Sequence, residues 1–141
     1  MKDIAIRENH LYQKTYRQGK RYVGRYVAVY VLRDLAARRL RNENPQKLYV
    51  NRLGISVSKK VGGAVQRNRA KRIIRAGYRP VAPLLKTGFL IVISARTEIA
   101  GRKSTEIEKE LRSAFSKLQM FRPAPGEKQN GARPEPGEKP E

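Results

Sequence analysis

The sequence VSKKVGGAVQRNRAKRIIR, residues 57–75, decides more about the fold and function of this chain than any other segment. It holds seven Lys and Arg residues in 19 positions, without an Asp or Glu. The stretch without carboxylates extends from Asn44 to Thr97 and contains 12 Lys and Arg residues. Folded surfaces usually mix both signs of charge, whereas a long stretch of one sign attracts polyanions. We therefore interpret this segment as a nucleic-acid-binding element rather than a solvated basic face.

Helical periodicity divides the residues after Gly63 into two faces. The apolar face, expected to pack on a sheet, comprises Ala70, Ile73, Ile74, Gly77 and Val81. The opposite face carries Asn68, Lys71, Arg72, Arg75 and Arg79, flanked by Arg67 and Arg69. Lys59 and Lys60 precede the helix and extend this basic patch, while the helix N-terminus itself favours phosphate. The pattern predicts a helix over 64–85 that Pro80 and Pro83 bend or shorten.

Composition bounds the class of protein. At 141 residues and 39% hydrophobic content the chain can form one compact domain, and its net charge of +20 points to nucleic acid. No apolar run approaches the roughly 20 residues of a membrane span, and the first ten residues lack a signal-peptide core. We therefore expect no membrane association. The absence of cysteine fits a reducing cytosol, so the predicted location is cytoplasmic.

The few acidic and imidazole groups argue against a protein-based nuclease. Metal-dependent nucleases cluster carboxylates, and others use His as acid and base. The basic segment has neither, and His10 is the only histidine. Glu106, Glu108 and Glu110 are close in sequence, but their i, i+2 spacing scatters them around a helix, so we interpret them as solvated helix charges. We expect no catalytic residue and no metal site in this chain.

Three strands and three further helices are expected around the basic helix. Residues 8–18 form a helix with Asn9 as N-cap, and a short helix is expected over 34–40. A Val- and Tyr-rich strand spans 22–32, and a second spans 48–58 with small residues on an open face. The apolar run 89–95 is a central strand buried on both faces. The last helix starts near Ser104 with a Thr105–Glu108 capping box. Its sheet-facing stripe comprises Ile107, Leu111, Ala114, Phe115 and Leu118.

Composition changes after residue 121. Residues 122–141 contain five Pro, three Gly, and equal numbers of acidic and basic residues. Such a segment buries too little apolar surface to offset the entropy of ordering. The predicted organisation is a folded domain over 1–121 and a disordered tail over 122–141.

Four tyrosines form a second group of candidate binding residues. Tyr12 and Tyr16 share a helix face, and Tyr26 and Tyr30 share a strand face. Aromatic rings hold splayed single-stranded RNA by stacking, at about 1–3 kcal/mol per base. The rings could equally cover a small core with their hydroxyls at the surface, and the residues alone leave both interpretations open.

The motif resembles the signature of the bacterial ribonuclease P protein subunit. The matching residues are SVSKKVG at 56–62, Ala64-Val65, the run RNRAKR at 67–72, and Arg75. The resemblance extends from Tyr12 to about Phe121. It implies an α/β two-layer sandwich related to the second domain of a small-subunit ribosomal protein, with the order αβββαβα and a mixed sheet. It also implies a left-handed crossover through helix 64–79, against the usual right-handed rule.

The resemblance implies an RNA-binding subunit of an endoribonuclease that removes the 5′ leader of precursor tRNA. The catalyst would be a large RNA that requires Mg²⁺, with no catalytic residue in this chain. Precursor tRNA and the ribonuclease P RNA would be the partners, with no obligate protein partner. The implied leader-binding residues are Tyr12, Tyr16 and Tyr30. The implied contacts to the RNA subunit are Lys59, Lys60, Arg67, Asn68, Arg69, Lys71, Arg72 and Arg75.

Two features depart from the family pattern. The segment 33–47 is longer than the usual connection, and the tail 122–141 is not part of the family core. The main alternative is a ribosomal or ribosome-assembly protein of similar fold, which would show no preference for a 5′ leader.

Overall fold

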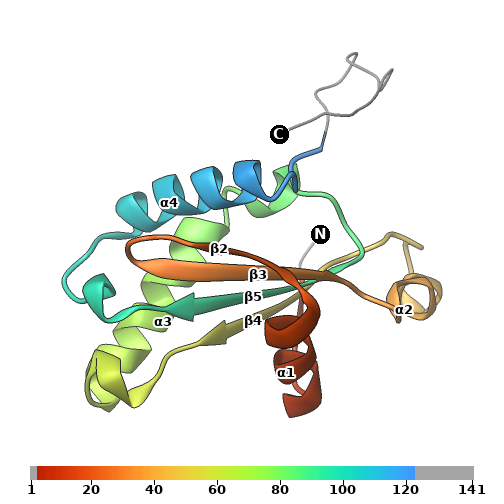
Figure 1. The fold of residues 1–141 in the computed structure, drawn as a ribbon. Helices are drawn as coiled ribbons and strands as arrows, with labels where there is room; N and C mark the ends of the chain where they lie inside the picture. Colours follow the sequence, from red (N-terminus) through yellow and green to blue (C-terminus); the bar gives the residue numbers. More distant parts are fainter. Residues whose placement is uncertain (1–2, 123–141) are drawn as a thin grey trace.

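The computed structural model describes residues 3–122 and contains one five-stranded mixed sheet in the order β1-β4-β5-β3-β2 (Figure 1). The strands are β1 (Ile4–Ala5), β2 (Lys20–Val23), β3 (Val27–Arg33), β4 (Arg52–Ser56) and β5 (Phe89–Ala95). Central β5 runs parallel to β4 and antiparallel to β3. The prediction of a central strand over 89–95 is confirmed.

Helices cover both faces of this sheet. Figure 1 shows α4 across one face with α3 beside it, and α1 on the opposite face. The helices are α1 (Asn9–Gln18), α2 (Ala37–Glu43), α3 (Ala64–Tyr78) and α4 (Ser104–Lys117). Short 3₁₀ turns lie at η1 (Lys59–Val61), η2 (Ala82–Leu84) and η3 (Thr97–Ile99). The expected order αβββαβα is confirmed, with β1 and α2 in addition. Helix α3 connects the parallel strands β4 and β5, and the left-handed sense of that crossover stays a prediction.

The main core lies between the sheet and the helices α3 and α4. Alternate residues of β3 and β5 point into it, as period-two burial requires. The largest contributors from the helices are Ile74, Ile107, Leu111 and Phe115, all fully buried. The predicted apolar stripe of the last helix is therefore confirmed. A smaller cluster on the opposite face joins Leu90 and Val92 to α1, so β5 is buried on both faces.

The strand predicted over 22–32 is in fact a hairpin of β2 and β3. Both strands have the expected composition, but the chain turns at residues 24–26. Backbone N–H groups of Arg25, Tyr26 and Val27 donate to the Glu110 carboxylate at 2.8–3.0 Å. Glu110 comes from α4, about 84 positions away, so no local pattern could have indicated this turn. Glu110 therefore links α4 to the β2–β3 hairpin through hydrogen bonds. The prediction that its side chain is only a solvated helix charge is wrong.

Several elements begin or end at residues other than those predicted. Helix α3 ends at Tyr78, two residues before Pro80, and the strand predicted over 48–58 narrows to β4. The helix expected over 34–40 lies at 37–43. The Thr105–Glu108 capping box is wrong, because the Glu106 carboxylate accepts the Lys103 N–H at 2.9 Å. Likewise, Glu8 rather than Asn9 precedes the first turn of α1.

The predicted tail falls outside the described residues, apart from Arg122. Within residues 3–122, no helix combines the length and apolar character needed to cross a membrane.

Candidate nucleic-acid interface

Helix α3 presents its basic side to solvent. Ala70, Ile74 and Gly77 are buried against the core, while Asn68, Arg72 and Arg75 are exposed, as the sequence predicts. The close packing of α3 on α4 depends on Gly77. A Cβ there would lie 2.9 Å from the backbone nitrogen of Glu108. This contact fixes the rotation of α3 about its axis and therefore the direction of its cations.

The other predicted RNA contacts surround this face. Lys59 and Lys60 are exposed on η1, immediately before α3, whereas Lys71 is half-buried. Arg69 donates to the carbonyl of Arg102 at 3.2 Å, which ties it to the loop before α4. Arg67 is half-buried, and its Nε is shielded from solvent without a hydrogen-bond partner. The eight predicted residues therefore lie together on η1 and α3, but they differ in solvent exposure and in the contacts of their side chains.

Charge on this surface is not neutralised within the protein. The described residues 3–122 contain ion pairs of Arg39, Arg52, Arg96, Arg102 and Arg112 with carboxylates. None of the eight predicted RNA contacts takes part in any of them. A row of cations without carboxylates keeps a high positive potential, which attracts a phosphate backbone.

Arg52, also within the acid-free stretch, is paired in the interior of the protein. Its guanidinium donates to both carboxylate oxygens of Asp34, at 2.7 and 2.8 Å, and both side chains are buried. Burial alone raises the pKa of Asp34, but hydrogen bonds from Arg52 and the Ala36 N–H outweigh it, and the pKa lies below its ordinary value. Arg52 thus joins β4 to the end of β3, and its charge is not available to a ligand.

The three predicted leader-binding tyrosines lie together on the α1 side of the sheet. The rings of Tyr16 and Tyr30 meet edge to face, with centroids 4.9 Å apart and an interplanar angle of 84°. The hydroxyls of Tyr16 and Ser94 are hydrogen-bonded at 3.1 Å. All three rings are half-buried, so they cover the small core and keep part of their surface accessible.

Tyr26 does not belong with this group. It lies in the β2–β3 turn, and its ring packs toward the main core, where the Arg102 guanidinium sits 5.6 Å from the ring centroid. The prediction that Tyr26 and Tyr30 share a strand face is therefore wrong. The turn held by Glu110 reverses the chain before the alternation can carry Tyr26 to the α1 side.

Tyr12 lies over Gly54 on β4. The face of β4 predicted to be open is thus partly covered, and Gly54 provides the room for the ring because it has no side chain. Burial raises the pKa of the Tyr12 hydroxyl above its ordinary value, and the nearby Tyr16 adds to this shift. The small residues of β4 therefore seat an aromatic ring of the protein itself.

A groove at the β1–β4 edge joins Tyr12 to the basic helix. It has a volume of about 320 Å³, and its lining includes Tyr12 and Gly54 together with Lys71 and Arg75 of α3. Asp3 also lines it and accepts a hydrogen bond from Tyr78, while burial raises the pKa of this carboxyl. No sequence pattern indicates this continuity, since the lining residues come from four separate elements.

Among residues 3–122, no three His, Cys, Asp or Glu side chains gather into a potential metal site. The donor set in this part of the chain therefore does not fit a protein-ligated Mg²⁺.

Comparison with known proteins identifies the family. Residues 1–119 match the family model described as Ribonuclease P. The ribonuclease P protein component of Clostridium acetobutylicum is 38% identical over 117 residues, covering 83% of this chain and 90% of the relative. That of Clostridium botulinum (strain Langeland) is 34% identical over 122 residues, covering 86% and 99%.

Solved structures agree with this relationship. The Staphylococcus aureus RNase P protein superposes with a TM-score of 0.67 at 27% identity, covering 86% of this chain and 100% of that structure. The Thermotoga maritima RNase P protein shares the fold, with a TM-score of 0.54 at 24% identity. The basic helix, the fold and these matches lead to one conclusion: this chain belongs to the bacterial ribonuclease P protein family, the protein components of a tRNA-processing ribonucleoprotein.

Proposed function

We propose that this chain binds the RNA subunit of ribonuclease P through α3 and the 5′ leader of precursor tRNA through its tyrosines. The observation that carries the proposal is the groove that Tyr12 lines together with Lys71 and Arg75 of α3. One continuous surface can then hold a folded RNA on the cationic helix and guide a single strand toward the aromatic rings. The protein would thereby favour precursor over mature tRNA, since only the precursor has a leader.

Binding to the RNA subunit would use Lys59, Lys60, Arg67, Asn68, Arg69, Lys71, Arg72 and Arg75. Arginine suits this task because its planar fork binds phosphate oxygens in pairs and stacks on bases. Exposed Arg72 and Arg75 have no carboxylate partner among the described residues, so RNA would not have to displace one.

Leader binding would use Tyr12, Tyr16 and Tyr30. Their half-buried rings are already oriented by packing and by the Tyr16–Ser94 hydrogen bond. A preordered ring loses little entropy when a base stacks on it, and each stacked base adds about 1–3 kcal/mol. Stacking tolerates any base, which suits leaders of differing sequence.

The phosphodiester hydrolysis itself would be carried by the RNA subunit. We assign no catalytic residue to this chain, and the Mg²⁺ that the reaction requires would be bound by RNA. The protein would contribute positive charge that lets polyanionic RNA elements approach one another. We place this activity in the cytoplasm, because precursor tRNA is an intracellular substrate.

Cleavage of a precursor tRNA tests the proposal. A bacterial ribonuclease P RNA would be assayed at low salt with Mg²⁺, with and without the full chain, beside the full chain alone. We expect strong stimulation by the protein and no cleavage by the protein alone. The double variant Arg72→Ala/Arg75→Ala should lose stimulation, whereas Arg25→Ala/Lys117→Ala, which removes two exposed cations elsewhere, should keep it.

Two results would contradict the proposal. Tight RNA binding without stimulation, and without preference for a leader, would favour the ribosome-assembly alternative. Cleavage by the protein alone, unaffected by removal of RNA, would place catalytic groups in this chain.

A further inference from the structure

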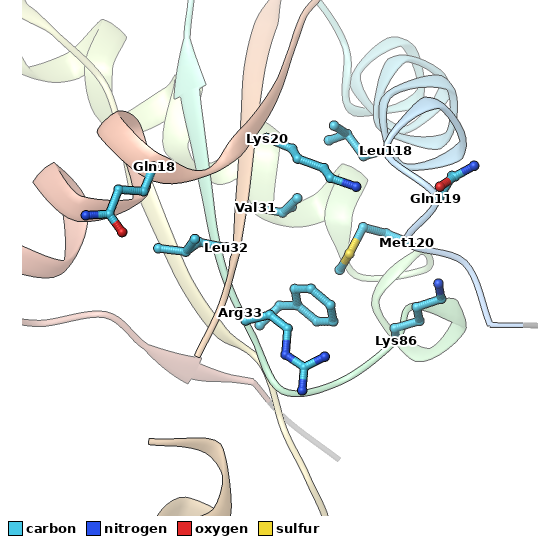
Figure 2. A pocket seen from close by; sticks show the side chains of 10 residues that line it. Gln18, Lys20, Val31, Leu32, Arg33, Lys86, Leu118, Gln119 and Met120 are labelled. Atoms are coloured by element: carbon cyan, nitrogen blue, oxygen red, sulfur yellow. The ribbon is translucent and has the colours of Figure 1, made fainter. Parts of the chain in front are cut away.

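A second pocket lies at the end of the sheet where β3 ends and β5 begins, beneath the end of α4 (Figure 2). Its volume is about 370 Å³, within the range of pockets that hold small organic ligands. It shares no lining residue with the groove beside α3. The lining residues are Gln18, Lys20, Val31, Leu32, Arg33, Lys86, Phe89, Leu118, Gln119 and Met120.

The wall of this pocket is held by backbone hydrogen bonds. After α4 the chain turns through Gln119, whose φ is +59°, and the Met120 N–H donates to the Phe115 carbonyl at 2.9 Å. This is a Schellman-type helix end, although the left-handed position is usually occupied by Gly. The Lys86 N–H then donates to the Met120 carbonyl at 2.7 Å. The pocket is therefore formed before any ligand arrives.

Cations from β2, from β3 and from the segment before β5 line the pocket. Figure 2 shows Lys20, Arg33 and Lys86 on different sides of Met120. All three cations are exposed, and none is in an ion pair among the described residues. No described Asp or Glu lines the pocket. The site consequently favours an anion.

The rest of the lining selects for more than an anion. Phe89, Leu118 and Met120 supply apolar side chains to the lining, and Phe89 is the half-buried aromatic residue among them. A flat aromatic ring stacks favourably on such a side chain. A nucleotide combines such a ring with a phosphate.

We propose that this pocket binds one nucleotide of single-stranded RNA. The phosphate would lie between Arg33 and Lys86, and the base would stack on Phe89. A duplex would not fit, because its bases are stacked and paired and cannot enter a concave pocket. This adds a second RNA contact, at the opposite end of the sheet from the start of α3, and it does not depend on the proposed function of the tyrosines.

Nuclear magnetic resonance of the full chain tests this proposal. The protein would be titrated with adenosine 5′-monophosphate, with a single-stranded RNA hexanucleotide, with inorganic phosphate and with a short poly-glutamate peptide. We expect both nucleotide probes to shift the backbone amide signals of Arg33, Phe89 and Met120. In Arg33→Ala/Lys86→Ala these shifts should require about tenfold more ligand. The control Arg25→Ala/Lys117→Ala should titrate like the wild-type protein.

The probes distinguish the proposal from its alternatives. Equal shifts with inorganic phosphate would show a simple anion site, and equal shifts with poly-glutamate would show a site for acidic peptides. Either result, or unchanged pocket signals with both nucleotide probes, would overturn the proposal. Signals of Arg72 and Arg75 on α3 report the other RNA surface in the same spectra, so failure at one site is visible separately from failure at the other.

Discussion

The ring of Tyr12 lies against the backbone of Gly54, so closely that a Cβ at Gly54 would be 2.5 Å from the Tyr12 hydroxyl oxygen. The clash would involve only the far end of a side chain, which can rotate away without moving the backbone. Gly54 therefore controls where an accessible aromatic ring sits, with little consequence for stability.

We expect Gly54→Ala to weaken the binding of leader-bearing tRNA through displacement of Tyr12. The loss should be about 1–3 kcal/mol if one stacked base is lost. Binding of leader-bearing and mature tRNA to the assembled complex would measure it. In a double-mutant cycle, Gly54→Ala should add little to Tyr12→Ala, since both remove the same contact. Additive losses would show that Gly54 acts independently of the ring.

Tyr16 and Tyr30 should contribute to the same preference. The two rings pack edge to face and hold one another in place. We therefore expect Tyr16→Ala and Tyr30→Ala each to weaken the binding of leader-bearing tRNA more than the binding of mature tRNA. Tyr49→Ala is the matched control, since Tyr49 is exposed and lies outside the tyrosine group. An equal loss for both tRNAs would instead make these rings core residues or general RNA contacts.

The cations of α3 should set the salt dependence of RNA binding. Removal of two phosphate contacts in Arg72→Ala/Arg75→Ala should reduce the slope of log affinity against log salt by about 1 unit for each arginine. Binding to the ribonuclease P RNA would be measured across a salt series, with Arg25→Ala/Lys117→Ala as control. An unchanged slope would mean that this helix face does not contact phosphates.

Gly77 should be required for the packing of α3 on α4. In Gly77→Ala the new methyl group would meet backbone atoms of α4, at 2.9 Å from the Glu108 nitrogen and 3.0 Å from the Ser104 oxygen. Because backbone cannot move aside cheaply, we expect the free energy of unfolding to fall by about 1–3 kcal/mol. Urea unfolding would measure this. The control Ala76→Ser, on the exposed side of α3, should cost about 0.5 kcal/mol.

The buried pair of Asp34 and Arg52 should make stability depend on pH. The folded pKa of Asp34 lies below its ordinary value of 3.8, so the pair contributes fully above that value. Its contribution is lost as the pH falls through the folded pKa. Asp34→Asn leaves the buried Arg52 guanidinium with only a 3.9 Å contact to the exposed Glu8 carboxylate, and we expect a loss of about 3–5 kcal/mol at neutral pH.

Urea unfolding between pH 3 and pH 7 would check this. The variant Asp34→Asn should lack the part of the acid-side decline that comes from this carboxyl. The control Glu43→Gln removes a carboxyl from an exposed ion pair and should follow the wild-type profile. If the free energy of unfolding depended on pH in the same way for wild type and Asp34→Asn, another group would be responsible for the loss of stability at low pH.

Local pattern was enough for most elements and for the face of the basic helix. The 3.6-residue period of α3 and α4 and the apolar run of β5 depend on near neighbours in sequence, and all three were predicted correctly. Predictions failed where distant residues intervene. The hairpin turn at residues 24–26 needs Glu110, and β1 is two residues long and exists because β4 lies beside it.

The sequence by itself determined that this protein has one acid-free basic helix and a family signature, because charge and periodicity are properties of neighbouring residues. Only the tertiary structure decided which of those residues remain available. It buried Arg52 against Asp34, tied Arg69 to the Arg102 carbonyl, and separated Tyr26 from Tyr30. It also joined Tyr12 to α3 through a groove. The physical reason is that burial, pairing and concavity arise from contacts between residues far apart in the chain, which no local spacing encodes.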